Sequence, residues 1–424
     1  MKKLRIGVLG GTRGLDFMNR VLNGHPKAEV TAICENHPGL KAKIESETAG
    51  TGMRVFSEFD EMLSDGLDAV IIANFANAHA PYAIRALKAG VNVFSESIPT
   101  QTMGEAVALA EAVEESGKLY CYGENYCYLP HVFAMRRFLE EGQMGEVMHA
   151  EGNFINDCSW KWHLLTRGDR NHWRNHVPST FYCTHSVGPV LYATGRRAVN
   201  VVAMETQRMP YMAQGGARSG SAAMEIMQLD NGGMAKSTNG NYRRQYSADY
   251  RFICENGTVE SDLYQFGRVR VLHPAGNGSY SLKEWDAPYV FDAFPVWSER
   301  DPAFLPPFEA ADVYLINCFV ESILGNPDAQ EYMIDVYRAL DMSMVGTLGY
   351  RSILEGSKPY VIPDMRLKSQ RDLWRGDNKS TDGAISAGDD LLPPNRDGFP
   401  DVADEVYEKV AKEFRDTPIT SGSH

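Results

Sequence analysis

The first 35 residues carry the feature that most constrains the fold, a strand, a glycine turn and a helix followed by a second strand that ends on an acidic residue. Residues 4–9 form a short apolar run, and apolar residues return at helical spacing over 15–22. A second apolar run, 28–34, ends at Glu35. This order is typical of the first βαβ unit of a dinucleotide-binding fold. The turn supplies five candidate cofactor contacts, Gly10, Gly11, Thr12, Arg13 and Gly14.

The residue types in this unit predict NAD as the cofactor. Glycines let the backbone approach a pyrophosphate at the N-terminus of a helix, and the Glu35 carboxylate can accept both hydroxyls of a ribose, which favours NAD over NADP. The turn departs from the usual G-x-G-x-x-G pattern, with Thr12 and Leu15 at its second and third glycine positions. Arg13 lies in the turn rather than after the second strand, so a pyrophosphate contact is favoured over a 2′-phosphate contact.

Strands and helices alternate to about residue 123 and then give way to a series of strands, which predicts an α/β protein of two domains. We expect an NAD-binding Rossmann domain over 1–123 and a substrate-binding α+β domain with an open, mostly antiparallel sheet over 124–364. A polar C-terminal arm with one helix, 365–424, follows, either over a neighbouring subunit or loosely ordered. Its final Ser-Gly-Ser-His is expected to be a tag remnant. Loops at the carboxyl ends of the first domain's strands supply further cofactor candidates, Asn74, His79, Glu96 and Asn125.

Composition excludes several function classes. The formal net charge of −13 argues against nucleic acid or an anionic membrane as a partner, and no apolar stretch is long enough to span a bilayer. The 7 cysteines are scattered without CxxC pairs, so neither a zinc site nor a disulfide framework is expected. The apolar run after the first lysines is too short for a signal peptide. We therefore expect a cytoplasmic protein without a metal.

A long aromatic and basic loop, 156–179, precedes a short segment that contains His185. Loops of this length inside a compact domain are usually functional. Its aromatic rings and cations could form a wall that stacks on a sugar, and a hydrophobic staple or a subunit contact is the alternative. The histidines of the loop have no cysteine or carboxylate spacing of a metal site. The candidate substrate residues are Trp160, Trp162, Trp173, Arg174, His176 and Tyr182.

The order of these motifs resembles the Gfo/Idh/MocA family of NAD(P)-dependent sugar oxidoreductases, over roughly residues 1–364. The resemblance implies a Rossmann domain followed by an open sheet that walls a sugar site. Most members carry Glu-Lys-Pro after the fifth strand, with the lysine as the proton acceptor. Here the register reads Glu96-Ser97-Ile98, and a serine at its normal pKa is a poor general base. Asp312 corresponds to an acid in the family's long helix, where a surface position is expected.

A more specific resemblance, to the NAD-dependent glycosidases of glycoside hydrolase family 109, rests on four segments. These are 124–128 (Glu-Asn-Tyr-Cys-Tyr), 145–152, 173–174 (Trp-Arg) and 184–189 (Thr-His-Ser-Val-Gly-Pro). Those proteins also lack the lysine. The resemblance implies that NAD⁺ oxidises the sugar 3-hydroxyl, a base removes the C2 proton, the C1 substituent leaves, water adds and the hydride returns. It places the acid/base residues at Tyr128 and His185, and both types suit the task.

Two other functions stay open at this stage. One is a sugar dehydrogenase that uses Tyr128 or His185 as its base, and the other is a non-catalytic NAD- and sugar-binding protein. The resemblance implies a carbohydrate as the substrate and a homo-oligomer that pairs through the open sheet. One position departs from the family 109 pattern, since Ser186 stands where those proteins have glycine, and the family's N-acetylgalactosamine specificity is therefore not carried over.

Overall fold

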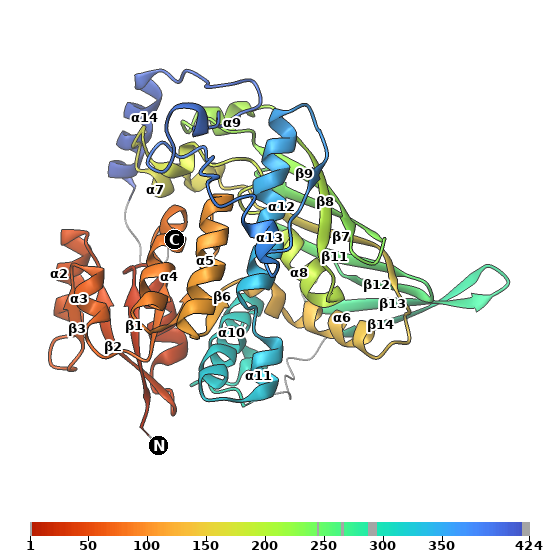
Figure 1. The fold of residues 1–424 in the computed structure, drawn as a ribbon, viewed down its shortest axis with the longest axis horizontal. Helices are drawn as coiled ribbons and strands as arrows, with labels where there is room; N and C mark the ends of the chain where they lie inside the picture. Colours follow the sequence, from red (N-terminus) through yellow and green to blue (C-terminus); the bar gives the residue numbers. More distant parts are fainter. Residues whose placement is uncertain (1, 244–245, 264–266, 287–294, 418–424) are drawn as a thin grey trace.

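The computed structural model describes residues 2–243, 246–263, 267–286 and 295–417, so the expected tag remnant lies outside the described residues. The chain forms two sheets, one of six strands and one of nine (Figure 1). The first is a parallel sheet of order β3-β2-β1-β4-β5-β6. Its strands are β1 (Leu4–Leu9), β2 (Ala28–Cys34), β3 (Arg54–Phe56), β4 (Ala69–Ile72), β5 (Asn92–Ser95) and β6 (Tyr120–Tyr122).

The expected alternation of strands and helices in this first part is confirmed. The central strand β4 is apolar and buried throughout, and the last four residues of β1 are buried as well, as strands covered on both faces must be. The connecting helices are α1 (Arg13–Phe17), continued by a π-helical turn (Met18–Leu22), α2 (Pro38–Glu47), α3 (Phe59–Leu63), α4 (His79–Lys88) and α5 (Met103–Ser116). Thr102 and Glu105 form a capping box that fixes the start of α5.

The second sheet has the order β14-β13-β12-β11-β7-β10-β9-β8-β15. The pair β7 and β10 is parallel and the other pairs are antiparallel, so the predicted open, mostly antiparallel sheet is confirmed. Its strands are β7 (Val147–Ile155), β8 (Ala198–Glu205), β9 (Ala222–Leu229), β10 (Met234–Gly240), β11 (Ser247–Cys254), β12 (Gly257–Ser261), β13 (Arg268–Gly276), β14 (Ser279–Asp286) and β15 (Tyr360–Val361).

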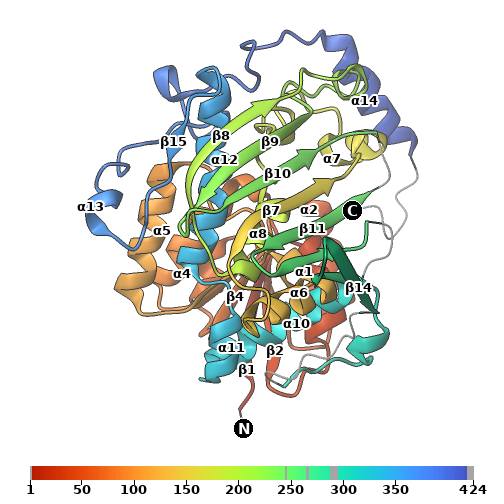
Figure 2. The ribbon, with the colours of Figure 1, turned by 90° about the vertical axis from the view of Figure 1, so that its right-hand side faces the viewer.

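One face of this sheet is covered by helices and the other is not (Figure 2). The helices α6, α8 and α12 pack on the inner face, and α8 lies so close to β7 that a Cβ at Gly152 would overlap the Ser186 carbonyl. Glycine is required there by the helix packing. The remaining helices are α6 (Pro130–Glu140), α7 (Trp162–Thr166), α8 (Thr184–Thr194), α9 (Pro210–Ala213), α10 (Pro307–Ile323), α11 (Pro327–Tyr332), α12 (Val336–Leu354), α13 (Lys368–Arg371) and α14 (Asp404–Asp416).

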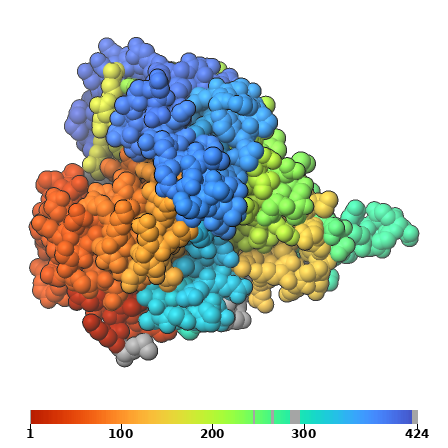
Figure 3. Space-filling model, viewed as in Figure 1, coloured from red at the N-terminus to blue at the C-terminus, as the bar shows by residue number. Residues whose placement is uncertain are grey.

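Several elements have no counterpart in the sequence pattern, and the longest of them are helix α8 and strand β14. Helix α8 contains Pro189 and begins without a side-chain cap, so neither a capping signal nor an uninterrupted pattern marks it in the sequence. Strand β14 pairs with β13 to form a hairpin that projects from the molecule (Figure 3). Among the described residues, no helix combines the length and the apolar composition that a membrane crossing requires.

The C-terminal arm packs on its own chain over its described residues, which corrects the expectation that it covers a neighbouring subunit or is loosely ordered (Figure 3). It begins on helix α5, where Arg371 donates to Glu114 at 2.8 Å and Arg375 forms two hydrogen bonds with Glu111. It then crosses α12, where Tyr350 donates to the Pro393 carbonyl at 2.6 Å. Its last helix, α14, packs on α7. The arm therefore holds the two parts of the chain together.

A buried carboxylate lies in the second sheet. Glu225 on β9 is fully buried, and both of its carboxylate oxygens accept hydrogen bonds from Asn239 Nδ2, at 2.9 and 3.0 Å. Burial raises the pKa of Glu225 from 4.5 to about 7. The folded protein thus keeps a proton on this group over a pH range in which the unfolded chain has lost it.

This difference predicts a pH-dependent loss of stability. Between pH 4.5 and 7 the folded state binds more protons than the unfolded state, so the free energy of unfolding falls as pH rises through that window. Relative to Glu225→Gln, the wild type should lose about 3 kcal/mol between pH 4.5 and 7.5, as measured by urea unfolding. Equal pH profiles for the two proteins would contradict this assignment.

Candidate active site

The glycine turn after β1 and the end of β2 meet at the carboxyl edge of the first sheet. Gly10 has φ +102°, and a Cβ there would lie 2.5 Å from the Ala73 carbonyl oxygen, so only glycine fits. Glu35 Oε2 accepts from the Gly11 amide at 2.8 Å, and its Oε1 accepts from the His37 amide at 2.7 Å. The carboxylate therefore lies against the turn at the N-terminal end of α1, where the ribose and pyrophosphate of a dinucleotide fit.

Arg13 links the two parts of the chain through two carboxylates. Its Nε donates to Glu96 at 2.6 Å, and its two terminal nitrogens donate to the two oxygens of Asp312 at 2.8 Å each. Asn125 Nδ2 donates to the same carboxylate at 3.0 Å. Asp312 lies on α10 and is mostly buried, so the expected surface position is wrong. Arg13, predicted to contact a pyrophosphate, is engaged by the carboxylates of Glu96 and Asp312 instead.

The loop after β4 contributes one buried polar group and one structural histidine. The Oδ1 atom of Asn74 is buried and has no hydrogen-bond partner among the described residues. His79 is 2% exposed, and its ring nitrogens lie 3.0 Å from the Ile98 carbonyl and 3.2 Å from the Asn74 carbonyl. Burial lowers the pKa of His79, so the neutral ring braces the two strand-end loops. Its predicted contact with the cofactor does not fit this position.

No lysine stands at the end of β5. Ser97 occupies the position after Glu96, its backbone amide donates to Glu96 Oε2 at 2.9 Å, and its hydroxyl oxygen is buried. The side chain is 9% exposed. The hydroxyl of a buried serine is too weak a base to remove a proton from a substrate near neutral pH. Acid/base chemistry at this edge of the sheet therefore depends on other residues.

A fully buried carboxylate orients His185. Glu124 follows β6 and is 0% exposed, and its Oε1 lies 2.7 Å from Nδ1 of His185, near the start of α8. The Nδ1–H donates to the carboxylate in this pair, which leaves Nε2 as the nitrogen available to a substrate. Glu124 also accepts from the Tyr126 amide at 3.4 Å. A histidine held in one tautomer by a buried carboxylate is suited to general acid/base work.

Three aromatic rings surround this histidine. The Tyr126 ring lies 4.3 Å from the His185 ring, the Phe154 ring 4.7 Å away, and the Tyr182 ring stacks on it at 5.8 Å with an interplanar angle of 9°. The hydroxyl of Tyr126 is hydrogen-bonded to that of Tyr246. Tyr182, predicted to contact substrate, therefore lies beside the catalytic candidate His185.

Tyr128 does not lie at this site. It is fully buried, and its hydroxyl donates to the Tyr332 carbonyl at 2.7 Å in the core behind the site. Burial raises its pKa well above the usual value, so it holds its proton. The acid/base role predicted for Tyr128 does not fit this environment, whereas Tyr126, two residues earlier on the same turn, lies beside His185.

The aromatic loop is divided between the site and the core. Trp173 packs on Phe181, with ring centroids 5.6 Å apart, and the Arg174 guanidinium lies over the rings of Trp173 and Tyr182 at 4.5 and 5.8 Å. Trp173 is itself 6% exposed and belongs to a small core cluster with Phe181, whereas Tyr182 stacks on His185. The substrate contacts of Trp173 and Arg174 stay predictions.

Other loop residues are used structurally. Trp162 is buried against Met212 and donates from Nε1 to Asn175 at 3.1 Å, so it is a core residue and its predicted substrate contact is wrong. His176 is bonded to the Arg170 carbonyl at 3.3 Å, and burial lowers its pKa. Trp160 is 69% exposed and lies near Lys161, away from the cluster of Trp173.

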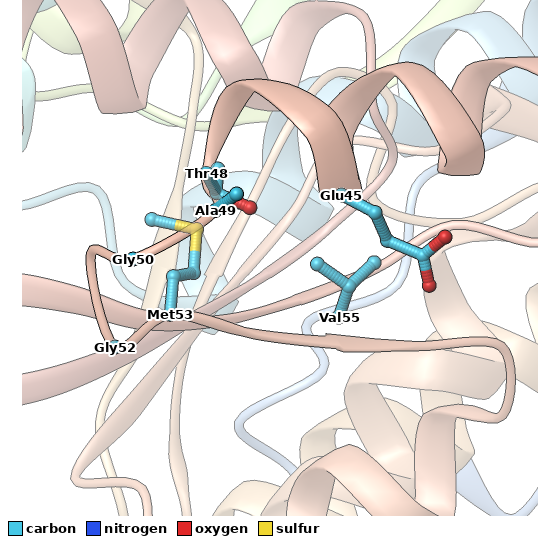
Figure 4. A pocket seen from close by; sticks show the side chains of 7 residues that line it. All are labelled: Glu45, Thr48, Ala49, Gly50, Gly52, Met53 and Val55. Carbon is cyan, nitrogen blue, oxygen red and sulfur yellow. The ribbon is translucent and has the colours of Figure 1, made fainter.

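A separate surface hollow lies between the end of α2 and the start of β3 (Figure 4). Helices end and strands begin at the edge of a parallel sheet opposite to the ligand edge, so this hollow is not the cofactor site. Within the described ranges, no group of three or more histidine, cysteine or acidic side chains is arranged to hold a metal ion. The residues that line the hollow are Glu45, Thr48, Ala49, Gly50, Gly52, Met53 and Val55.

Comparison with known proteins identifies the first domain. Residues 4–124 match the family model described as "Oxidoreductase family, NAD-binding Rossmann fold", GFO_IDH_MocA. These residues therefore form an NAD-binding Rossmann domain similar to that of the Gfo/Idh/MocA oxidoreductases. The predicted family, the predicted NAD cofactor and the prediction of an enzyme are thereby confirmed.

The relatives extend this likeness beyond the Gfo/Idh/MocA domain. A glycosyl hydrolase family 109 protein of Stenotrophomonas maltophilia is 23% identical over 86% of this chain and 89% of its own. Another from Shewanella amazonensis is 27% identical over 45% of this chain, a match that spans 44% of that relative. An alpha-N-acetylgalactosaminidase of Shewanella oneidensis is 27% identical over the same shares of the two chains.

Solved Gfo/Idh/MocA-type structures share the fold. A levoglucosan dehydrogenase in complex with NADH and L-sorbose has a TM-score of 0.67 at 18% identity, over 86% of this chain and 100% of its own. An oxidoreductase from Agrobacterium radiobacter in complex with NAD⁺, L-tartaric acid and magnesium has a TM-score of 0.66 at 15% identity, over 85% and 99%.

Sequence reasoning did not assign the roles of three polar residues at this site. Glu124 and Tyr126 lie within the segment that resembles family 109. The position of the family's acid/base tyrosine in that segment corresponds to Tyr128, so the sequence pointed to Tyr128 rather than Tyr126. The side-chain direction within a single 3₁₀ turn is set by packing and leaves no mark in sequence spacing. Asp312 lies almost 300 residues from its partner Arg13, so no local pattern links them.

The position of Glu35 predicts a preference for NAD⁺ over NADP⁺. Its carboxylate would repel a 2′-phosphate and can accept the ribose hydroxyls. Calorimetry should show that NAD⁺ binds at least about tenfold more tightly than NADP⁺. The Glu35→Ser variant should bring the dissociation constants of the two nucleotides closer together. Glu45→Gln, at the hollow on α2, is the matched control. Tighter binding of NADP⁺ by the wild type would contradict the prediction.

Proposed function

We propose that this protein cleaves a glycosidic bond through transient oxidation of the sugar at C3, with His185 as the principal acid/base. The pair of buried Glu124 and His185, 2.7 Å apart, carries the proposal, because it supplies a base where the end of β5 supplies only Ser97. The relatives named as family 109 glycosyl hydrolases support it. Since each relative is under 30% identical, the activity is a proposal for this chain.

The cradle at Gly10 and the carboxylate of Glu35 fit NAD, and Asn74 offers a buried oxygen at the same edge. Bound NAD supplies a reversible hydride acceptor for C3 of the sugar. The Arg13 network holds Glu96 and Asn125 at this edge, and Asp312 brings α10 against it. The chain's own contribution is to position both ligands and to move protons.

His185 performs the proton transfers in this proposal. As C3 becomes a ketone, Nε2 of His185 accepts the proton of the 3-hydroxyl and releases it to solvent. While C3 is a ketone, the C2 proton is acidic because an enolate spreads the negative charge, and Nε2 of His185 removes that proton. The C1–O bond then breaks and the leaving group departs with a proton supplied by a neighbouring acid. Water adds at C1, C2 regains a proton, and C3 returns to an alcohol, so the overall reaction is hydrolysis and consumes no nicotinamide.

Tyr126 is the second acid/base in this proposal, in place of Tyr128. Its ring lies 4.3 Å from the His185 ring, and its hydroxyl is bonded to Tyr246. Burial raises the pKa of Tyr126 well above the usual value, as it does for Tyr128, so both phenols carry their protons at neutral pH. Tyr126 is the proposed donor to the leaving group because its ring lies beside His185, whereas the Tyr128 hydroxyl is bonded to the Tyr332 carbonyl in the core.

A sugar dehydrogenase is the second candidate function. The observation that favours it is the fold shared with the levoglucosan dehydrogenase, and His185 could then accept the proton of the hydroxyl being oxidised. Such an enzyme would consume NAD⁺ stoichiometrically. A non-catalytic NAD- and sugar-binding protein would show neither exchange nor turnover.

The deciding experiment uses p-nitrophenyl glycosides in D₂O with substoichiometric NAD⁺. The proposal predicts many turnovers per NAD⁺, deuterium at C2 of the released sugar and no accumulation of NADH. Stoichiometric NADH with an intact glycosidic bond would establish the dehydrogenase instead.

Variants assign the roles. His185→Ala and Tyr126→Phe should each lower kcat by about 10²–10⁴-fold, since one well-placed acid/base group contributes that much. Tyr128→Phe removes one hydroxyl from the core and should leave kcat within a few-fold, and Ser97→Ala should do the same. A large loss of kcat in Tyr128→Phe with normal stability would return the catalytic role to that residue.

We also propose that two copies of the chain pair through the uncovered face of the second sheet (Figure 2). Exposed apolar side chains follow one another across neighbouring strands of that face, a pattern that marks an interaction surface. The face is polar in places, with Glu151 and Lys236 among its side chains. Its exposed apolar residues are Met148, Met204, Met224, Ile226, Met234 and Ile253.

The test is the mass in solution. Ile226→Glu, together with Met234→Glu, should convert a dimer into a monomer in analytical ultracentrifugation, because two charges in an apolar interface are costly to bury. Val361→Glu, on the edge strand β15, is the control. A wild type that sediments as a monomer at 100 µM (a concentration on the order of weak interfaces) would contradict the proposal.

A further inference from the structure

Three loop segments leave the second sheet at one edge. β7 and β10 are parallel and end side by side, with Ile155 opposite Gly240, and β9 and β11 begin opposite them. Helices α7 and α9 lie near each other at this end of the molecule (Figure 1). We call segments 156–183, 206–221 and 241–243 the loop rim. The first of them leads directly to α8 and His185.

The loop rim is basic although the chain is acidic. Its three segments contain seven lysine and arginine residues and two aspartates, in a chain whose formal net charge is −13. Part of this charge is neutralised, since Arg170 pairs with Asp404 of the C-terminal arm. The remaining lysine and arginine side chains give the loop rim a positive charge, which attracts anionic ligands to it.

Arg174 brings a cation next to the catalytic candidate. Its guanidinium lies over the Trp173 ring at 4.5 Å and the Tyr182 ring at 5.8 Å, and Tyr182 in turn stacks on His185. Within the described part of the chain, no carboxylate lies within ion-pair distance of Arg174. The rings hold the guanidinium in place and leave its charge unneutralised.

Two further arginines extend the same charge along the loop rim. The Arg218 amide donates to the Asn175 carbonyl at 2.9 Å, and its guanidinium donates to the Tyr407 hydroxyl at 3.1 Å. Arg208 donates to the Ala217 carbonyl at 3.5 Å. Both use uncharged acceptors, and no ion pair with a carboxylate is formed by either one among the described residues.

We propose that the loop rim recognises an anionic group on the saccharide, so that the substrate is an acidic sugar with a carboxylate or a sulfate ester. The inference rests on the proposed sugar site at His185. Arg174 takes the anion of the sugar at the site, and Arg218 and Arg208 take those of the next sugar units. The planar guanidinium donates two parallel hydrogen bonds to such an anion. Because the guanidinium of Arg174 is already held over aromatic rings, binding the anion costs little additional side-chain entropy.

The experiment measures the binding of matched methyl glycosides by calorimetry in the presence of NADH. The probes are the methyl glucuronide and glucoside, the methyl galacturonide and galactoside, and the 6-sulfates of the neutral pair. We expect at least about tenfold tighter binding of an acidic member than of its neutral partner, weakened between 25 and 300 mM NaCl (concentrations of the order that screens exposed charges). Comparing the uronides with the 6-sulfates shows whether the site prefers a carboxylate or a sulfate ester.

Variants connect the preference to the loop rim. Arg174→Gln should abolish most of the acidic preference while neutral glycosides bind within a few-fold of the wild type. Arg137→Gln, an exposed arginine on α6, is the matched control and should keep the preference. Equal binding of acidic and neutral sugars by the wild type, or an acidic preference that survives Arg174→Gln, overturns the inference.

A second measurement on the same glycosides separates this inference from the proposed function. Deuterium exchange at C2 is measured on every glycoside in D₂O with NAD⁺ in place of NADH. Exchange without an acidic preference overturns the recognition of an anion and leaves the proposed chemistry standing. An acidic preference that depends on Arg174, without any exchange, supports the recognition of an anion and overturns the proposed chemistry.

Discussion

The buried Glu124–His185 pair is the interaction on which the site depends. Glu124 follows the last strand of the parallel sheet, and His185 lies on the helix that packs against the second sheet, so a single contact of 2.7 Å joins the two halves at the proposed reacting centre. A fully buried carboxylate is costly without a partner, and the imidazole supplies that partner. In return the carboxylate fixes the orientation and tautomer of the ring. Packing of α8 on Gly152 of β7 sets the distance between them.

Two further features hold the halves in register. Arg13 joins the glycine turn to α10 through Glu96 and Asp312, which places a charged bridge at the edge where the cofactor fits. On the other side of the molecule the C-terminal arm crosses from α5 to α7 (Figure 3). The site thus lies between two connections that are distant in sequence. A protein that must keep a cofactor and a sugar in fixed relative positions through several proton transfers needs such a rigid frame.

Ser97 stands where a lysine would act as the proton acceptor, so the base of the proposed reaction has to be another residue. A cofactor site without the usual proton acceptor implies either lost chemistry or a base elsewhere, and the histidine of the Glu124–His185 pair is such a base. The rings of Tyr126 and Tyr182 cover the imidazole on two sides. Arg174 extends the same stack toward the loop rim. The proposed proton transfer and the proposed recognition of the substrate therefore share one continuous set of aromatic contacts.

Sequence alone determined the parallel sheet and the Glu35 position after β2, and it selected His185 as a candidate, because strand alternation, turn glycines and motif order are local properties of the chain. It could not separate Tyr126 from Tyr128. Both are tyrosines in one short turn, and only packing decides that the ring of Tyr126 lies beside His185 while the hydroxyl of Tyr128 lies in the core. Nor could it join Arg13 to Asp312, or the C-terminal arm to α5, because these contacts depend on where the whole chain folds back on itself.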